Sequence, residues 1–239
     1  MLLTLGLILI ARPSASFAIK PSLLAHNLPP QPNNDKTLLI AGIDVSHYQG
    51  KVDWAEVTEQ KIHFAYLKAT DGITYTDPMY HSNQTQINAH SLPNGAYHFF
   101  EPTDDGVKQA QNFLSQLIIH DNMLPPVLDV EINHGVDKQL IQQRVKQWLD
   151  TVEEKVGCKP IIYSYGSFYQ TYLGEHFLDY PLWLADYAPQ ATLPKDVKNW
   201  LFWQHSQKGK VPGIKNSVDL NWYEGSAQSL SEQLCRKKA

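Results

Sequence analysis

Short apolar segments alternate with helical patterns along most of this chain, and this alternation limits the folds that it can adopt. Apolar runs rich in β-branched and aromatic residues predict buried strands at residues 38–44, 64–68, 95–100, 126–131, 160–164, 182–186, 201–205 and 217–220. Helical patterns separate the early runs, at residues 53–60, 79–90, 104–119 and 138–156. Strands that alternate with helices imply a parallel sheet with right-handed crossovers. Eight strands favour a single-domain α/β barrel of the TIM type over an open sheet, and the short, Pro-rich later connections predict that this barrel is irregular.

The N-terminal segment differs from the rest of the chain. Its apolar run, residues 2–11, is too short to span a bilayer as a helix, and Ser16-Phe17-Ala18 has small residues where a signal peptidase cleaves. We therefore expect a secretory signal peptide over residues 1–18, or an uncleaved anchor, because no Lys or Arg precedes the run. A Pro-rich linker then covers residues 19–36, and the folded domain covers residues 37–239.

Composition excludes several classes of function. The net charge is -4, and removal of Arg12 with the signal would make it -5, which argues against nucleic acid as a partner. The ten His are scattered and no phosphate-binding loop is present, so we expect neither a metal nor a cofactor. Cys158 and Cys235 could form a disulfide after export, although sequence alone does not show whether their geometry fits.

A pair of acids stands at the end of one predicted strand, where Asp129-Val130-Glu131 follows the apolar run 125–128. Side chains on a strand alternate between faces, so Asp129 and Glu131 share a face, with Cβ atoms about 6.5–7 Å apart. That range includes the carboxyl separations of glycoside hydrolases. Two neighbouring acids also tend to split their pKa values, so one can keep a proton near neutral pH. The alternative is a strand end that simply enters solvent.

Barrel closure would bring two more acids to the same place. Catalytic groups of such barrels lie at the carboxyl ends of the strands. Asp44 ends the first predicted strand and Asp219 lies in the last, and in a closed barrel these strands are neighbours. Both acids would face Asp129 and Glu131 across the mouth. Because like charges repel and buried charges lose hydration, such convergence favours a functional interpretation.

Nine short motifs follow one another in a specific order between Gly42 and Tyr223. They are GIDVSHYQG (42–50), KATDG (68–72), GAYHFF (95–100), LDVE (128–131), IYSY (162–165), PLWLADY (181–187), WQHS (203–206), VPGI (211–214) and VDLN (218–221). Taken together, they resemble the glycoside hydrolase family 25 lysozymes, which are the Chalaropsis-type N-acetylmuramidases. This chain departs from the family pattern at Asp71, where the family usually has Glu.

The resemblance implies an irregular β/α barrel that cleaves the β-1,4 bond between N-acetylmuramic acid and N-acetylglucosamine in peptidoglycan. It implies that Glu131 is the general acid and that Asp129 is either a nucleophile or the group that orients the substrate 2-acetamido group. Asp44 and Asp219 are then expected to shape the electric field and hold sugar hydroxyls, or else to form structural hydrogen bonds with loop backbone.

Flat side chains near the predicted strand ends are candidates for sugar binding. The candidate substrate-binding residues are Tyr97, Tyr165, Tyr187, Trp203 and the strand-terminal Asp186. For the aromatic residues, packing in the core is the alternative. His98 is either a core histidine or a substrate contact, and Asp77 is expected to fix a loop.

The sequence therefore predicts a secreted or cell-envelope muramidase that acts on peptidoglycan strands as a monomer, with no membrane span left after signal removal. Two alternatives remain at this stage. One is a barrel that binds peptidoglycan or chitin fragments without cleaving them, because fold does not imply activity. The other is a hydrolase of another amino-sugar polymer, such as chitin.

Overall fold

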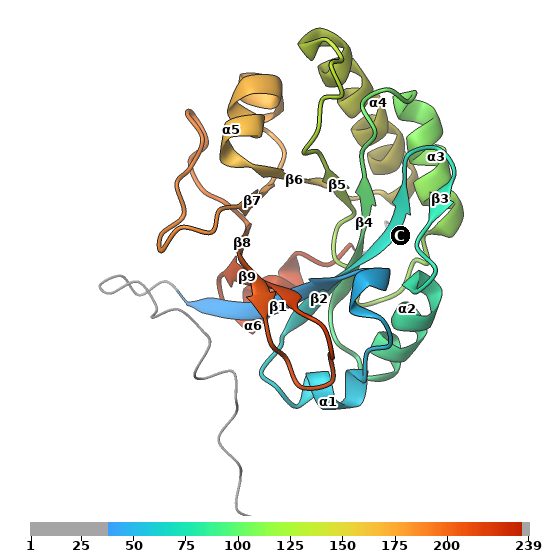
Figure 1. Cartoon of the computed structure of the whole chain (residues 1–239), viewed down its shortest axis with the longest axis vertical. Coiled ribbons are helices and arrows are strands. Elements are labelled where there is room, and N and C mark those ends of the chain that lie inside the picture. The colour runs from blue at the N-terminus through green and yellow to red at the C-terminus, as the bar shows by residue number, and fades with distance from the viewer. Residues whose placement is uncertain (1–37, 236–239) are drawn as a thin grey trace, which may run out of the picture.

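The computed structural model describes residues 38–235 (Figure 1). The predicted signal peptide, residues 1–18, and the predicted linker, residues 19–36, lie outside this range. Within the range, no helix combines the length and the apolar character needed to cross a membrane.

A closed sheet of eight strands forms the centre of the molecule, which confirms the predicted single-domain α/β barrel. The strands are β1 (Leu39–Val45), β2 (Phe64–Asp71), β4 (Asn94–Phe99), β5 (Val127–Asp129), β6 (Ile161–Tyr165), β7 (Leu182–Ala185), β8 (Phe202–Gly209) and β9 (Val218–Glu224). The barrel closes because β1 pairs with β2 on one side and with β9 on the other. A two-residue strand, β3 (Tyr75–Thr76), extends the sheet beyond β2.

The last strand runs against its neighbours, so the expectation of an all-parallel sheet was wrong for β9. Strand β9 is antiparallel to both β8 and β1. The connection between β8 and β9, residues 210–217, is too short for the helical crossover that a parallel pair requires, and it forms a hairpin instead. As a result, the start of β9 lies at the mouth where the other strands end.

Helices surround the barrel unevenly (Figure 1). The four predicted helices form as α1 (Trp54–Thr58), α2 (Tyr80–Ala89), α3 (Gly106–Gln116) and α4 (Lys138–Val156). Beyond β6 the chain forms only short helical segments, which are α5 (Gly166–Phe168), the turns Tyr169–Leu173 and Gly174–Phe177, and α6 (Ala227–Glu232). The incomplete helical ring agrees with the irregular barrel expected from the short later connections.

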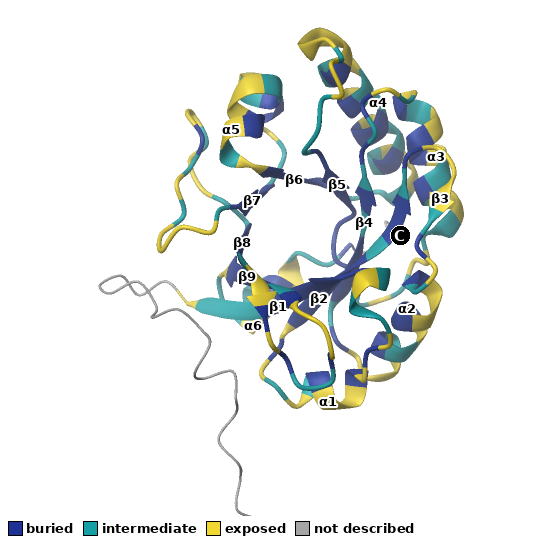
Figure 2. Cartoon of the chain, in the orientation of Figure 1, coloured by how far each residue is buried: buried dark blue, intermediate teal, exposed yellow. Residues whose placement is uncertain are grey.

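Aromatic side chains fill the barrel below its mouth. The ring centroids of Tyr66 and Trp183 are 4.8 Å apart, and those of Phe64 and Phe202 are 4.9 Å apart. Gly95 makes room for Tyr66, since a Cβ atom there would lie 2.2 Å from its ring. A second apolar cluster packs between the strands and the helices, and the strands are accordingly buried while the outer helix faces are exposed (Figure 2). The aromatic cluster leaves only the mouth open for a polar site.

A disulfide joins Cys158, just after α4, to Cys235, just after α6. The two Cα atoms are 5.5 Å apart and the residues are 77 positions apart in sequence. This pairing answers the question that the sequence left open, and it ties the end of the described chain to the helical layer.

Candidate active site

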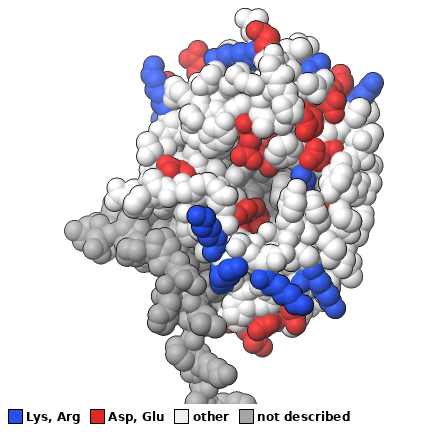
Figure 3. All heavy atoms as spheres, in the orientation of Figure 1, with Lys and Arg blue, Asp and Glu red and all other residues white. Residues whose placement is uncertain are grey.

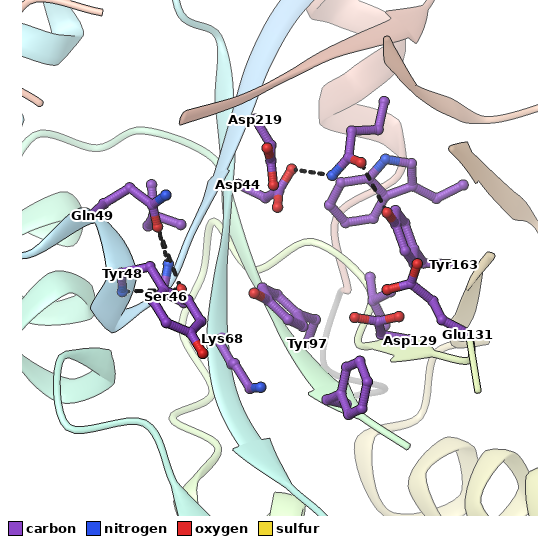
Figure 4. Close-up of a pocket in the computed structure, with 15 residues that line it drawn as sticks. Asp44, Ser46, Tyr48, Gln49, Lys68, Tyr97, Asp129, Glu131, Tyr163 and Asp219 are labelled. Atoms are coloured by element: carbon purple, nitrogen blue, oxygen red, sulfur yellow. Dashed lines mark hydrogen bonds between the residues drawn. The ribbon is translucent and has the colours of Figure 1, made fainter. Parts of the chain in front are cut away.

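Four carboxyl groups meet in a cavity of about 240 Å³ at the barrel mouth (Figure 4). Asp44 comes from β1 and Asp219 from the start of β9, while Asp129 ends β5 and Glu131 follows two residues later. The structure thus brings together all four acids that the sequence singled out. On the same face, acidic side chains gather around the hollow (Figure 3).

Asp44 and Asp219 form the first carboxyl pair because they are register partners in β1 and β9. Asp44 Oδ2 accepts hydrogen bonds from Gln204 Nε2 at 3.0 Å and from Asn221 Nδ2 at 2.8 Å. Burial raises the pKa of Asp44, and these two donors oppose the rise. Burial, the charge of Asp44 and a hydrogen bond to it raise the pKa of Asp219 to about 9. A pKa of about 9 means that Asp219 keeps its proton at neutral pH.

Asp129 and Glu131 form the second pair. Burial, followed by the charge of Glu131, raises the pKa of Asp129 well above its ordinary value. Burial also raises the pKa of Glu131, whereas a hydrogen bond from Asp129 lowers it. Burial thus raises the pKa of both carboxyls, and more strongly that of Asp129, the more buried partner.

Gln204 connects the first pair to two tyrosines through hydrogen bonds. Its Nε2 donates to Asp44, and its Oε1 accepts from Tyr163 Oη at 2.8 Å and from Tyr187 Oη at 2.7 Å. Because the carbonyl oxygen accepts two hydroxyls, the amide is held with its N–H toward Asp44. The charge of Glu131 contributes to a raised pKa at Tyr163, which is consistent with the ring facing the second pair.

Three of the predicted aromatic residues lie at the cavity or beside it. Tyr97 lines the cavity, and burial raises its pKa well above the ordinary value, with Asp44 and Asp129 adding to the effect. Tyr187 is half exposed and reaches the site through Gln204. Tyr165 lines an adjoining cavity that also includes Glu131.

Trp203 and Asp186 do not line either of these cavities. Trp203 Nε1 donates to the backbone oxygen of Asp186 at 2.6 Å. The Asp186 carboxylate accepts backbone N–H groups of Ala188 at 3.0 Å and Thr192 at 2.8 Å. Strand alternation explains the position of Trp203, since its neighbour Gln204 points into the mouth and Trp203 therefore points outward. Both residues shape the loop after β7.

His98 is a core residue, which decides between the two interpretations of the sequence. It is fully buried, contacts Thr70 Oγ1 at 2.7 Å and Gln109 Oε1 at 3.1 Å, and stacks on Trp148. Burial lowers its pKa to about 3, so it stays neutral.

Asp77 fixes a loop, as the sequence predicted. Its carboxylate accepts the backbone N–H groups of His47 at 3.0 Å and Met79 at 2.9 Å, and it lies 2.7 Å from His47 Nδ1. These contacts hold the turn that follows Asp44.

Several cavity residues had no role assigned to them from the sequence. They are Ser46, Tyr48, Gln49, Lys68, Phe99, Tyr163, Trp183 and Gln204. Most of them belong to the motifs described above, so the sequence indicated that they lie close to the site. It did not indicate which face of the strand each side chain occupies, because that depends on strand register. Among residues 38–235, no group of three or more His, Cys, Asp or Glu is arranged to hold a metal ion.

Comparisons with known proteins identify the family of the chain. The profile of Glycosyl hydrolases family 25 matches residues 43–214. The chain is 39% identical over 196 residues to the uncharacterized protein YegX of Escherichia coli (strain K12), covering 80% of this chain and 72% of that protein. It is 33% identical over 205 residues to lysozyme M1 of Streptomyces globisporus, covering 80% and 70% of the two chains. A family 25 glycosyl hydrolase structure from Bacillus anthracis superposes with a TM-score of 0.78 at 29% identity, covering 85% and 96% of the two chains.

The raised pKa of Asp219 makes stability depend on pH. Because the folded pKa is about 9 and the ordinary value is 3.8, the folded state binds a proton that the unfolded state has lost between these values. The contribution of Asp219 to the free energy of unfolding is therefore greatest near pH 4 and falls as the pH rises toward 9. Asp219→Asn, whose amide can still donate to Asp44, should raise the melting temperature at pH 8 and change it little at pH 4. Each kcal/mol corresponds to about 2–4 °C in a protein of this size.

Melting curves of the wild type and the variant at pH 4, 6 and 8 measure this difference. Asp179→Asn, at an exposed position, is the matched control and should show no comparable gain. An equal shift at all three pH values would contradict the assignment of a proton to Asp219.

Proposed function

The chain belongs to glycosyl hydrolases family 25, and we propose that it is a lysozyme that hydrolyses the β-1,4 bond between N-acetylmuramic acid and N-acetylglucosamine in peptidoglycan. The observation that carries this proposal is the pair Asp129 and Glu131, two carboxyls that lie together in the cavity at the barrel mouth, where burial raises the pKa of both. A buried carboxyl that keeps a proton near neutral pH is what general acid catalysis of glycoside cleavage requires.

Glu131 is suited to be the general acid because it borders both cavities at the mouth. A glycan that runs from one cavity to the other would bring its glycosidic oxygen past this carboxyl. Binding of the sugar would exclude water, which favours the protonated form of Glu131. As the proton passes from Glu131 to the glycosidic oxygen, the bond from that oxygen to C1 breaks and the leaving sugar departs as an alcohol.

Asp129 is suited to stabilise the positive charge that then develops at C1. It can do so as a nucleophile, or by holding the 2-acetamido group so that the acetamido oxygen attacks C1. We favour the second role. Asp129 Oδ1 is buried and has no hydrogen-bond partner among the described residues, and the acetamido N–H is a donor of the kind it lacks.

Asp44 and Asp219 lie on the opposite wall of the cavity from this pair (Figure 4). We propose that their single negative charge helps to stabilise the cationic sugar and that their free lone pairs accept sugar hydroxyls. Tyr97, which lines the floor between the pairs, would contact the sugar in the same cavity.

We propose that the protein acts outside the cytoplasmic membrane, as a monomer. Peptidoglycan lies there, the segment 1–18 has the features of an export signal, and all four acids come from one chain. The disulfide between Cys158 and Cys235 supports this location, because such bonds form and persist in oxidising compartments.

Glu131→Gln should abolish lysis while leaving the fold intact. The amide is close to the same shape but cannot deliver a proton, and general acid catalysis contributes about 10²–10⁴-fold. Turbidity loss of purified cell walls, run beside the same assay on chitin, measures both activity and substrate. The exposed Glu154→Gln is the control and should retain wild-type lysis.

Each outcome of that assay has a clear meaning. A Glu131→Gln variant that keeps more than about a tenth of the wild-type rate would show that Glu131 is not the acid. Wild-type protein that degrades chitin but not walls would contradict the proposed substrate. Wild-type protein that binds walls without clearing them would indicate a binding barrel.

Asp129→Asn should also reduce lysis severely, and the wild-type product should retain the anomeric configuration. Both proposed roles of Asp129 involve two displacements at C1, so NMR of the freshly released reducing end should show retention. Predominant inversion would exclude both roles. Mass spectrometry of enzyme quenched during turnover then separates them, because only a nucleophilic Asp129 would carry a covalently bound glycan.

Exported material should begin at or within a few residues of Ile19-Lys20-Pro21, because the small residues at 16 and 18 mark the cleavage site. N-terminal sequencing of protein recovered from the medium or the cell envelope provides the measurement. Intact protein with Met1 in the membrane fraction would indicate an anchor instead. Recovery from the cytosol alone would be incompatible with export.

A further inference from the structure

One cation lies among the acids of the catalytic cavity. Lys68 is the only Lys, Arg or His among the described residues that line this cavity. It belongs to β2, and its side chain is 12% exposed. A long side chain with a strongly hydrated ammonium is rarely held in such a position unless it is paired.

Contacts on several sides hold the ammonium of Lys68. Nζ donates to Asp71 Oδ2 at 2.8 Å, lies 4.8 Å from the centroid of the Phe99 ring, and lies 5.7 Å from that of Tyr75. The Asp71 side chain is itself only 26% exposed. Since both partners of the ion pair are largely withdrawn from solvent and the ring faces are attractive to cations, the charge has a defined place.

An irregularity in the sheet makes the pairing with Asp71 possible. Residues three apart on a regular strand point to opposite faces, so Lys68 and Asp71 would not meet. The register between β2 and β4 shifts between Lys68 and Thr70, and such a bulge redirects the side chains that follow it. The backbone is therefore arranged so that the carboxylate of Asp71 reaches the ammonium from the same side.

The field of Lys68 acts on the catalytic pair from this fixed position. Its charge lowers the pKa of both Asp129 and Glu131, opposing the larger effect of burial. Several titratable and charged groups face Lys68 or the pair. They are Asp44 on β1, Asp71 on β2, Tyr75 on β3, Tyr97 on β4, Glu101 after β4 with His134 at 3.4 Å from it, Tyr163 on β6, Tyr187 after β7 and Asp219 on β9. His98 of β4 lies in the core instead, where burial lowers its pKa to about 3. Asp71 holds the ammonium in place through the hydrogen bond of 2.8 Å, and the charge of Lys68 still contributes to the pKa values of the pair.

We propose that Lys68, held by Asp71 and Phe99, is a positioning residue whose fixed positive charge sets the pH range in which Asp129 and Glu131 share a single proton. This proposal rests on the proposed lysozyme activity, because one carboxyl of the pair must donate a proton while the other is ionised. With Lys68 removed, its charge no longer opposes the effect of burial on the two pKa values. The pair then takes up its first and its second proton at higher pH, and the doubly protonated, inactive form extends toward neutrality.

The pH profile of wall lysis tests the proposal. In Lys68→Met both limbs of the pH profile should move to higher pH. The ratio of kcat/KM at pH 8 to kcat/KM at pH 5 should rise about tenfold, which corresponds to a change of about one unit in the pKa values of the pair. Lys68→Arg, which restores the charge, should return the profile toward that of the wild type. Lys198→Met removes the same charge at an exposed site away from the cavity and should leave the profile unchanged.

A second variant covers the case in which an unpaired Asp71 prevents folding. The double variant Lys68→Met with Asp71→Asn removes both charges of the ion pair and should show the same displacement to higher pH. Either variant with a wild-type profile would overturn the proposal. A loss of rate that is equal at every pH would also overturn it, because that result indicates a structural role alone.

A measurement without substrate separates this proposal from the proposed function. Carbon-13 NMR titration of the side-chain carboxyls in the folded protein should show Asp129 and Glu131 titrating at higher pH in Lys68→Met than in the wild type. If the wild type failed to lyse walls, the proposed function would fail while this titration still tested the role of Lys68. If lysis were confirmed and the titration were unchanged, only the role of Lys68 would be rejected.

Discussion

Barrel closure through β1 is the interaction on which the candidate active site depends. Strand β1 hydrogen-bonds to β2 on one edge and to β9 on the other, and this register sets Asp44 directly opposite Asp219. The same closure places the carboxyl end of β5 across the mouth from Asp44 and Asp219. Because aromatic rings fill the barrel below, the four carboxyls have little access to water from beneath. The site is thus a consequence of how the sheet closes, and no separate domain or loop is needed to assemble it.

Four acids in one small cavity would repel one another if all were ionised. The structure arranges them as two pairs, and burial raises the pKa values of all four carboxyls, which favours protonation over repulsion. The pairs differ in their surroundings. Asp44 is held by two amide donors from β8 and β9, which fix it as the ionised partner. Asp129 has an oxygen with no donor among the described residues, and its partner Glu131 borders the open cavity. The first pair is therefore suited to provide a constant field, and the second is suited to exchange its proton.

Much of this arrangement follows from the sequence, and the remainder depends on strand direction and register. Eight apolar runs predict the barrel, and closure makes the first and last strands neighbours, which is why Asp44 and Asp219 could be paired in advance. The antiparallel direction of β9 was not predicted, because the periodicity of a strand is the same in either direction. Trp203 was assigned to the sugar site although it faces outward, because a shift of one residue exchanges the two faces of a strand. The ion pair between Lys68 and Asp71 depends on a bulge that composition and periodicity do not indicate.

The energetic cost of the site also argues for catalysis over simple binding. A barrel that only bound glycans could use Asn or Gln at these four positions, since amides supply donors and acceptors for sugar hydroxyls without burying a charge. Carboxyls with raised pKa values destabilise the folded state as the pH rises, and a disulfide and a filled barrel offset such losses elsewhere in the molecule. An amide has no proton to transfer and no negative charge to offer a developing cation. Carboxyls that are buried, paired and partly protonated have both, so their presence at the barrel mouth is best explained by a reaction in which a proton moves and a positive charge develops.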